Sequence, residues 1–230
     1  MPMDAIRRPK SLTETVLERL RDAIVNGDFE LGSALSERVL AERLNVSKTP
    51  VRESLVQLRG EGLVTIVPQK GAYVFTLSAR EVVQICEFRL ALEGAGLSLA
   101  IQRNRDALAR DLSEVVDRMQ KALGHGDQRK YLTLDTEFHN AIFAHCGNQY
   151  LTDSYGRYIG KIAALRTHLA SKALHTHLSF EEHKLIRDAV RAGTEAEVDN
   201  LLRRHIGRTE ETYSLEIEDI AMADKTSKGA

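Results

Sequence analysis

The sequence predicts a mainly α-helical protein, with an N-terminal winged helix-turn-helix and a C-terminal antiparallel all-helical bundle. Three observations support this fold class. Residues 36–58 contain two short helical patterns separated by a tight turn. Two β-branched runs around a Pro/Gly turn follow directly, within residues 63–75. From residue 79 to about residue 220 there is no convincing strand pattern, and apolar residues recur at helical spacing.

The composition is typical of a soluble globular protein. The chain has 230 residues, enough for two domains of ordinary size, with 43% hydrophobic and 28% charged residues. No apolar run approaches the ~20 residues of a membrane span, and the first residues lack the apolar core of a signal peptide. Cys86 and Cys146 have neither paired nor metal-type spacing. We therefore expect reduced core cysteines and a cytoplasmic protein.

The formal net charge of −1 argues against binding a polyanion through overall charge. Any contact with nucleic acid must then depend on where the cations lie, and not on how many there are. Affinity would have to come from local contacts and from dimerisation.

Four regions follow from the patterns along the chain. Residues 1–10 are polar with two prolines and are predicted to form a flexible arm. Residues 11–77 form the winged helix-turn-helix. Residues 78–222 form the helical domain, and residues 223–230 are expected to be a disordered tail.

The three N-terminal helices are predicted from signals at their ends. Ser11 opens the first helix with a capping-box pattern. Ser36 opens the second, which stops near Asn45, a residue that tolerates the left-handed conformation. Ser47 opens the third, with Pro50 in the first turn, where a missing N–H has no cost. The two later helices, separated by a short turn, form a helix-turn-helix.

The exposed face of the third predicted helix carries Lys48, Thr49 and Arg52. Cations and a hydroxyl at the start of a helix suit the DNA major groove, where phosphate contacts position a protein and base edges give specificity. The alternative is an ordinary solvated helix face, which is what most charge clusters are.

A predicted β-hairpin follows this helix. Residues 63–67 and 72–75 are β-rich and flank a Pro/Gly turn. A hairpin in this position is a wing. Lys70 and Gly71 lie at its tip, where the chain can approach a phosphate.

These N-terminal positions resemble the winged helix of the GntR family of bacterial transcription regulators. The matching residues are Leu35, Ser36, Glu37, Arg38, Leu40, Ala41, Leu44, Val46, Ser47, Thr49, Pro50, Val51, Arg52, Glu53, Leu55, Leu58, Glu61, Gly62, Leu63, Val64 and Gly71. The resemblance implies DNA contacts at Arg38, Lys48, Thr49, Arg52 and Gly71, and Lys70 adjoins the last of these.

Two residues depart from the family pattern. Lys48 stands where arginine is more frequent, which removes a bidentate fork and is expected to alter base preference. Ser54 stands where alanine is usual, and we expect no effect from this change.

Six helical segments are predicted in the C-terminal domain. They span residues 79–103, 105–124, 127–146, 148–173, 179–193 and 195–220. Each carries apolar residues at i, i+3 or i+4 with polar residues between them, so we expect an antiparallel bundle.

Four polar residues of this bundle are candidate metal ligands. Asp135 and His139 are four residues apart and share a helix face, while His183 and His205 lie on two other predicted helices. A bundle can bring three such faces together in its core. Spacing alone leaves the alternative of ordinary buried or surface histidines open. The remaining histidines show no such pattern, and His175 and His177 are expected on a loop between helices.

Residues 79–220 resemble the FCD ligand-binding domain of the FadR branch of the GntR family, in its six-helix, VanR-like form. The matching residues are Arg89, Leu90, Ala91, Leu92, Glu93, Asp135, Phe138, His139, Gly147, Asn148, Glu182, His183 and His205. The resemblance implies that Asp135, His139, His183 and His205 ligate a divalent transition metal. Such a mixed nitrogen and oxygen site suits Zn, Ni, Mn or Fe.

Arg89 is the candidate partner for an effector. Its guanidinium can bind a small carboxylate through two parallel hydrogen bonds, and the family resemblance indicates the same role. The alternative is an exposed ion pair with Glu93, four residues further along the helix.

The function expected from these features is that of a metabolite-responsive bacterial transcription regulator and not an enzyme. A homodimer would bind a palindromic DNA operator, a small organic acid would be the effector, and repression is the commoner mode in the family. The alternatives are a metal-dependent hydrolase, with Glu182 as the nearest candidate base, and a regulator whose metal is purely structural.

Overall fold

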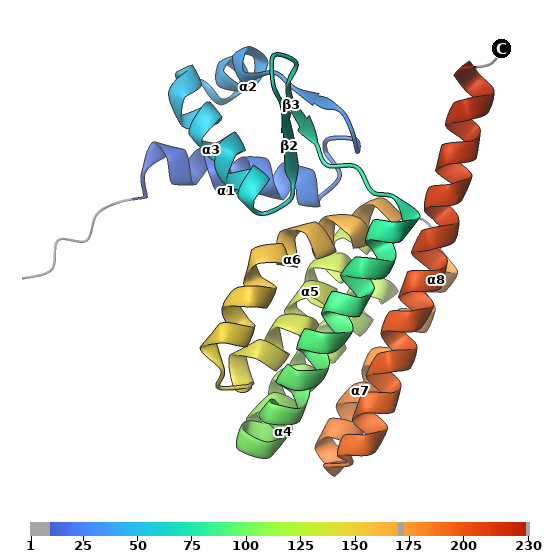
Figure 1. Ribbon diagram of the computed structural model, residues 1–230. Coiled ribbons are helices and arrows are strands. Elements are labelled where there is room, and N and C mark those ends of the chain that lie inside the picture. The colour runs from blue at the N-terminus through green and yellow to red at the C-terminus, as the bar shows by residue number, and fades with distance from the viewer. Residues whose placement is uncertain (1–9, 170–172, 229–230) are drawn as a thin grey trace, which may run out of the picture. The chain divides into compact units, whose positions relative to one another are not determined.

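The computed structural model describes residues 10–169 and 173–228, so the predicted arm lies outside the described residues except for Lys10. The backbone divides into two compact units, Met1–Thr76 and Leu77–Ala230. The first combines helices with a small sheet and the second is helical, which confirms the predicted fold class (Figure 1). None of the described helices is long and apolar enough to cross a membrane.

The first unit contains helices α1 (Leu12–Val25), α2 (Glu37–Leu44) and α3 (Lys48–Gly60). The Ser11 side chain accepts a hydrogen bond from the Glu14 backbone N–H, and the Glu14 carboxylate accepts one from the Ser11 backbone N–H, so the predicted capping box is present. The Ser36 side chain caps α2 by accepting a hydrogen bond from the Val39 backbone N–H. Asn45 ends α2 in the left-handed conformation, with φ of 53°.

Helix α3 packs against α1 through an apolar stripe. The side chains of Val51, Leu55 and Leu58 recur at helical spacing and are buried. Ser54 shares this face, and its hydroxyl donates either to Pro50 O at 2.7 Å or to Thr13 O of α1 at 3.1 Å. The expectation that Ser54 has no structural effect is therefore wrong, because its buried hydroxyl can link α3 to α1.

The wing is part of a three-stranded antiparallel sheet of order β1-β3-β2. Strands β2 (Val64–Val67) and β3 (Gly71–Val74) form the predicted hairpin. Strand β1 (Ala34–Leu35) pairs with β3, and no strand was predicted at these residues. Two residues are too few to display an alternating pattern, and only pairing with β3 defines this strand.

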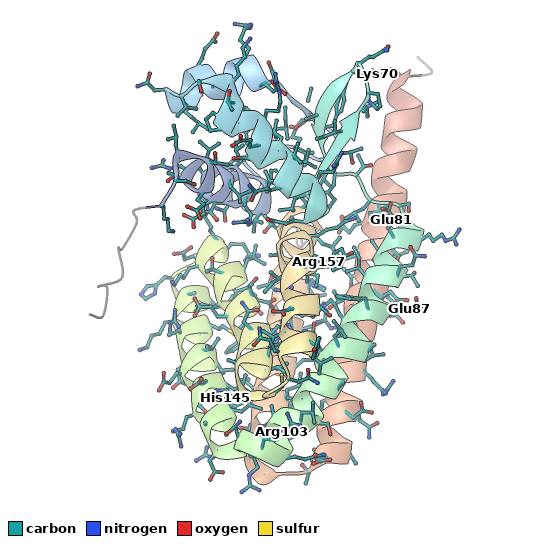
Figure 2. All side chains as sticks on the ribbon, turned by 60° about the vertical axis from the view of Figure 1, so that its left-hand side comes forward. Lys70, Glu81, Glu87, Arg103, His145 and Arg157 are labelled. Carbon is teal, nitrogen blue, oxygen red and sulfur yellow. The ribbon has the colours of Figure 1, made fainter. Side chains whose placement is uncertain are left out.

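The second unit contains α4 (Ala79–Gly124), α5 (Gln128–His145), α6 (Gln149–Leu169), α7 (Ala173–Ala192) and α8 (Glu195–Lys228). The predicted break at Asn104 appears as a kink within α4, where the backbone leaves helical geometry. The kink is tied to the end of α5, since the Asn104 side chain donates to His145 O at 2.9 Å. Arg103 also donates to Cys146 O at 2.8 Å, and Figure 2 shows Arg103 and His145 at the same end of the bundle.

Two predicted boundaries in the bundle are wrong. The break expected at residues 175–179 is helical, because α7 begins at Ala173 and contains His175 and His177. The buried His175 ring contacts Arg208 of α8, a tertiary contact that the local sequence does not reveal. Helix α8 continues to Lys228, so residues 223–228 are helical and not a disordered tail, and residues 229–230 lie outside the described part of the chain.

Helices α4 and α5 approach each other closely at Gly96. A Cβ added at Gly96 would lie 3.2 Å from Phe143 Cε1 and 3.3 Å from Ile142 Cγ2. The same addition at Gly94 would meet only the carboxylate of Asp199, at 3.9 Å. The two glycines, two residues apart on α4, therefore differ in the space beside them.

Alanine should have opposite effects at these two glycines. Gly96→Ala is expected to lower the free energy of unfolding by about 1–2 kcal/mol, because crowding of buried side chains outweighs the gain in helix propensity. Gly94→Ala, the matched control, is expected to raise it by about 0.5–1 kcal/mol. Urea denaturation followed by circular dichroism measures both, and equal stabilisation by the two changes would contradict the described α4–α5 packing.

Candidate functional site

Three histidines from three helices meet inside the bundle. His139 lies on α5, His183 on α7 and His205 on α8, and all three side chains are buried. One ring nitrogen from each lies within 4.8 Å of the others. The structure thus brings together three of the four residues predicted as metal ligands.

The three imidazoles are neutral at pH 7. Burial penalises the charged form and lowers the pKa of His139 to about 4, that of His183 to about 3 and that of His205 to about 4. A neutral imidazole carries one nitrogen lone pair, which is what a metal ion requires of a histidine ligand.

A buried glutamate orients His205. Glu182 Oε2 lies 2.9 Å from His205 Nδ1, so Nδ1–H donates and the Nε2 lone pair is left available. Arg208 holds the same carboxylate through Nε at 2.8 Å and Nη2 at 2.6 Å. Burial would raise the pKa of Glu182, but the hydrogen bonds from Arg208 and His205 lower it to about 2. The Glu182 carboxylate is therefore engaged by Arg208 and His205. It is not positioned as a general base beside His183.

A second glutamate contacts His139 in a similar manner. Glu93 Oε2 lies 2.8 Å from His139 Nδ1, a close contact in which the two atoms do not form a hydrogen bond. Glu93 Oε1 accepts from Arg89 Nε at 2.8 Å and from the Tyr155 hydroxyl at 3.2 Å. In contrast, neither ring nitrogen of His183 has a hydrogen-bond partner among the described residues.

The orienting role of these two glutamates was not predicted. The sequence indicated Glu93 and Glu182 as residues that match the family pattern, Glu93 also as an exposed partner of Arg89, and Glu182 also as the nearest candidate base of a hydrolase. Their contacts with His139 and His205 join different helices, and sequence spacing carries no signal for such pairs.

Asp135, the fourth predicted ligand, lies beside the triad. Its Oδ1 is 3.7 Å from His183 Nε2, and its Oδ2 is 3.9 Å from His139 Nε2. Arg166 Nη1 pairs with Oδ2 at 2.7 Å. Burial alone would raise the pKa of Asp135, but Arg166 and the nearby imidazoles lower it well below its usual range. The carboxylate is therefore charged.

Arg89 is 1% exposed, and its pair with Glu93 lies in the interior of the bundle. The alternative of an exposed surface pair is therefore wrong, although the pair itself forms. Burial would lower the pKa of Arg89, but Glu93 raises it above the usual value, so the guanidinium is charged. Its Nη2 lies 3.3 Å from His139 Nε2, the nitrogen whose lone pair a metal would use. Metal binding through this nitrogen requires Arg89 to move away.

A small polar cavity adjoins the triad, with a volume of about 10 Å³, the space of one water molecule. The cavity is lined by Arg89, Tyr131, Leu132, Asp135, Arg166, His175, Thr176, Ser179, His205, Thr209 and Tyr213. Most of these side chains are polar, and two are arginines. Such a lining favours a small anionic ligand over an apolar one.

The donor set fits a divalent transition metal. Metal–ligand bonds of about 2.0–2.2 Å place neighbouring ligand atoms on the order of 3–4 Å apart, so modest contraction of this cluster is sufficient. Neutral imidazoles, a charged carboxylate and the unpartnered nitrogens of His183 are the chemistry that such an ion prefers.

The candidate DNA-recognition residues lie on the surface of the first unit. Lys48 and Thr49 are exposed in the first turn of α3, and the Ser47 side chain makes no capping bond, which leaves this helix N-terminus open to a phosphate. Arg52 is also exposed and pairs with Glu37 of α2 at 2.8 Å. Arg38 pairs with Glu42 on the surface at 2.9 Å.

The wing tip presents a cation and an open backbone. Lys70 lies at the end of the β2–β3 hairpin and extends outward (Figure 2). Gly71 has φ of +111°, a conformation that favours glycine, and nothing lies within 4 Å of a Cβ added there. The Tyr73 hydroxyl donates to Lys70 O at 3.2 Å and supports the turn.

These features define a class: a DNA-binding winged helix joined to a helical ligand-binding domain. The profile of bacterial regulatory proteins of the gntR family matches residues 12–74, and the profile of the FCD domain matches residues 84–208. The chain belongs to the GntR family of transcription regulators, with a C-terminal FCD domain.

Curated relatives agree with this assignment. The chain is 31% identical over 202 residues to the HTH-type transcriptional repressor GlaR of Escherichia coli (strain K12), an alignment covering 81% of this chain and 89% of GlaR. It is 29% identical to the repressor NanR of Klebsiella aerogenes, over 90% of this chain and 88% of NanR. These relatives are transcription regulators and not enzymes, so the hydrolase alternative is wrong.

Solved structures share the fold. A GntR transcriptional regulator from Rhodococcus sp. RHA1 superimposes with a TM-score of 0.77 at 26% identity, covering 89% of this chain and 98% of that one. Escherichia coli McbR/YncC superimposes with a TM-score of 0.78 at 21% identity, covering 90% and 99%.

Removing the carboxylate that orients His205 should weaken metal binding. Glu182→Gln is expected to lower the affinity for Zn²⁺ by roughly 10–100-fold, because a neutral amide supports the required tautomer less well. Glu181→Gln is the matched control, since Glu181 lies next in the chain and pairs with Lys184 on the surface. Competition against a chromophoric chelator measures both affinities, and equal values for the two variants would exclude this role for Glu182.

Proposed function

We propose that this protein is a metabolite-responsive repressor that binds a palindromic operator as a homodimer and is controlled by a metal-assisted carboxylate site. The observation that carries the proposal is the buried triad of neutral histidines beside a cavity with two arginines, in a chain that also has a winged helix-turn-helix. Repression is inferred from the names of the relatives, GlaR and NanR. Acting on DNA, such a bacterial regulator works in the cytoplasm.

In this proposal α3 is the recognition helix. Lys48, Thr49 and Arg52 face the major groove, and Arg38 contacts the DNA backbone from α2. The Glu37–Arg52 pair favours one orientation of the guanidinium before DNA is bound. Lys48 contributes a point charge and lacks the fork that arginine offers to guanine.

The wing supplies a second contact in this proposal. Lys70 and the open backbone at Gly71 approach a phosphate beside the major groove. With a net charge of −1, the protein has little overall attraction for DNA, so these local contacts must supply the affinity.

The small number of contacts that one unit can make with DNA also favours binding as a dimer. One recognition helix reads too few base pairs for useful specificity, whereas two helices on a two-fold axis read both halves of a palindrome. The helical domain would supply the interface between the two copies.

In this proposal the helical domain also controls binding to the operator. Asp135, His139, His183 and His205 would hold Zn, Ni, Mn or Fe, a Lewis acid whose positive charge attracts the effector. Arg89, displaced from His139 by the metal, becomes available to a carboxylate. Effector binding would favour a spacing of the two DNA-reading units that no longer matches the operator, a coupling of typically ~1–3 kcal/mol.

The DNA half of the proposal is tested with one arginine. Arg52→Ala is expected to weaken specific operator binding at least about 10-fold, since a bidentate base contact contributes ~1–3 kcal/mol. Arg19→Ala, an exposed arginine on α1, is the matched control. Fluorescence anisotropy with labelled operator DNA measures both affinities, and unchanged binding by Arg52→Ala would overturn the assignment of α3 as the recognition helix.

A further inference from the structure

Three buried or partly buried ion pairs surround the cavity and the triad. Arg89 pairs with Glu93 at 2.8 Å, Arg166 with Asp135 at 2.7 Å and Arg208 with Glu182 at 2.6 Å. Three cations are thus matched by three anions, so none of these arginines is left without a counter-charge with which to retain an added anion.

A divalent metal changes this balance. The ligands of the metal add no further charge to this balance, because imidazoles bind as neutral groups and the negative charge of Asp135 is already included. The loaded site therefore carries two positive charges in excess. Uncompensated charge in a buried site is costly. One monocarboxylate would leave half of this excess, whereas one dianion would remove it.

Arg166 shows where the second negative charge would lie. Arg166 is 5% exposed and lines the cavity, and its Nη1 contacts Asp135 and donates to Thr136 Oγ1 at 3.0 Å. Its Nη2 is buried without a hydrogen-bond partner among the described residues. A buried guanidinium donor without an acceptor is unfavourable, and a ligand carboxylate would supply the acceptor.

The two groups that would bind the ligand's acid groups, the metal beside the histidines and Arg166, are close together. Asp135 lies between them, with Oδ1 3.7 Å from His183 Nε2 and Oδ2 2.7 Å from Arg166 Nη1. The two acid groups of a ligand that reaches both must therefore be separated by a short chain. The cavity has a volume of about 10 Å³, so the lining side chains must move apart when such a ligand binds.

We propose that the effector is a short dicarboxylate, with one acid group offsetting the charge of the metal and the other accepting a hydrogen bond from Arg166 Nη2. This inference rests on the proposed function of the helical domain as a metal-assisted effector site. It assigns the choice of a diacid over a monoacid to Arg166, while Arg89 serves the acid group nearer the triad.

Calorimetry on the full-length, Zn²⁺-loaded protein tests the proposal. Malonate, succinate and glutarate are compared with propionate, butyrate and valerate, the monoacids of the same chain length. The tightest diacid is expected to bind roughly 10–100-fold more strongly than its matched monoacid, the range of one hydrogen bond to a charged group. Inorganic phosphate is included as a dianion of different shape.

Arg166 variants assign the effect to this residue. Arg166→Gln is expected to remove the preference for diacids, and Arg166→Lys, which keeps the charge but not the fork, to reduce it. Arg191→Gln, on the exposed surface of α7, should retain the full preference. Thermal melts and Zn²⁺ stoichiometry, measured for every variant, separate loss of folding or metal from loss of ligand selectivity.

The outcomes distinguish this inference from the proposal on which it rests. Zn²⁺ binding with equal affinity for diacids and monoacids would overturn the dicarboxylate assignment and leave the metal-assisted site intact. Tighter binding of phosphate than of any diacid would also overturn it. Failure of the wild-type protein to bind Zn²⁺ would overturn both.

Discussion

Contacts between carboxylates and imidazoles in the buried interior of the bundle are the constraint on which the helical domain depends. Burying three histidines leaves their N–H groups in need of acceptors. Glu182 accepts from His205, Glu93 contacts His139, and each glutamate is held by an arginine. These pairs connect α4 with α5 and α7 with α8. The apolar core packs around this polar centre, where the Nε2 lone pair of His205 is available to a ligand and that of His139 becomes available once Arg89 moves away.

In both units of the chain, a few cations are each paired with a carboxylate. In the winged helix, Glu37 pairs with Arg52, the cation that we propose faces DNA, and the open N-terminus of α3 adds the partial positive charge of a helix end. In the bundle, every charged side chain around the cavity has a partner of opposite sign. In the proposed function, a few placed groups recognise anions without a strong overall field, which agrees with the net charge of −1.

Local signals predicted much of the fold and part of the site. Caps at Ser11 and Ser36 and the left-handed Asn45 each depend on neighbouring residues, and all are present. The predicted break at Asn104 is present as a kink, although its side chain bonds to the distant His145. Strand β1 and the start of α7 depend on partners distant in the chain and were missed. The histidines were found because their spacing and the family resemblance indicated them. The orienting glutamates and Arg166 were not, since their contacts cross between helices.

The central claim is that the buried triad binds a metal. Elemental mass spectrometry on protein purified without a histidine tag or chelator tests it most directly. The account predicts about one divalent transition-metal ion per chain, lost in His183→Ala and retained in His145→Ala, whose ring pairs with Asp111 away from the triad. Absence of metal from the wild-type protein, even after addition of Zn²⁺, Ni²⁺ and Mn²⁺, would contradict the account.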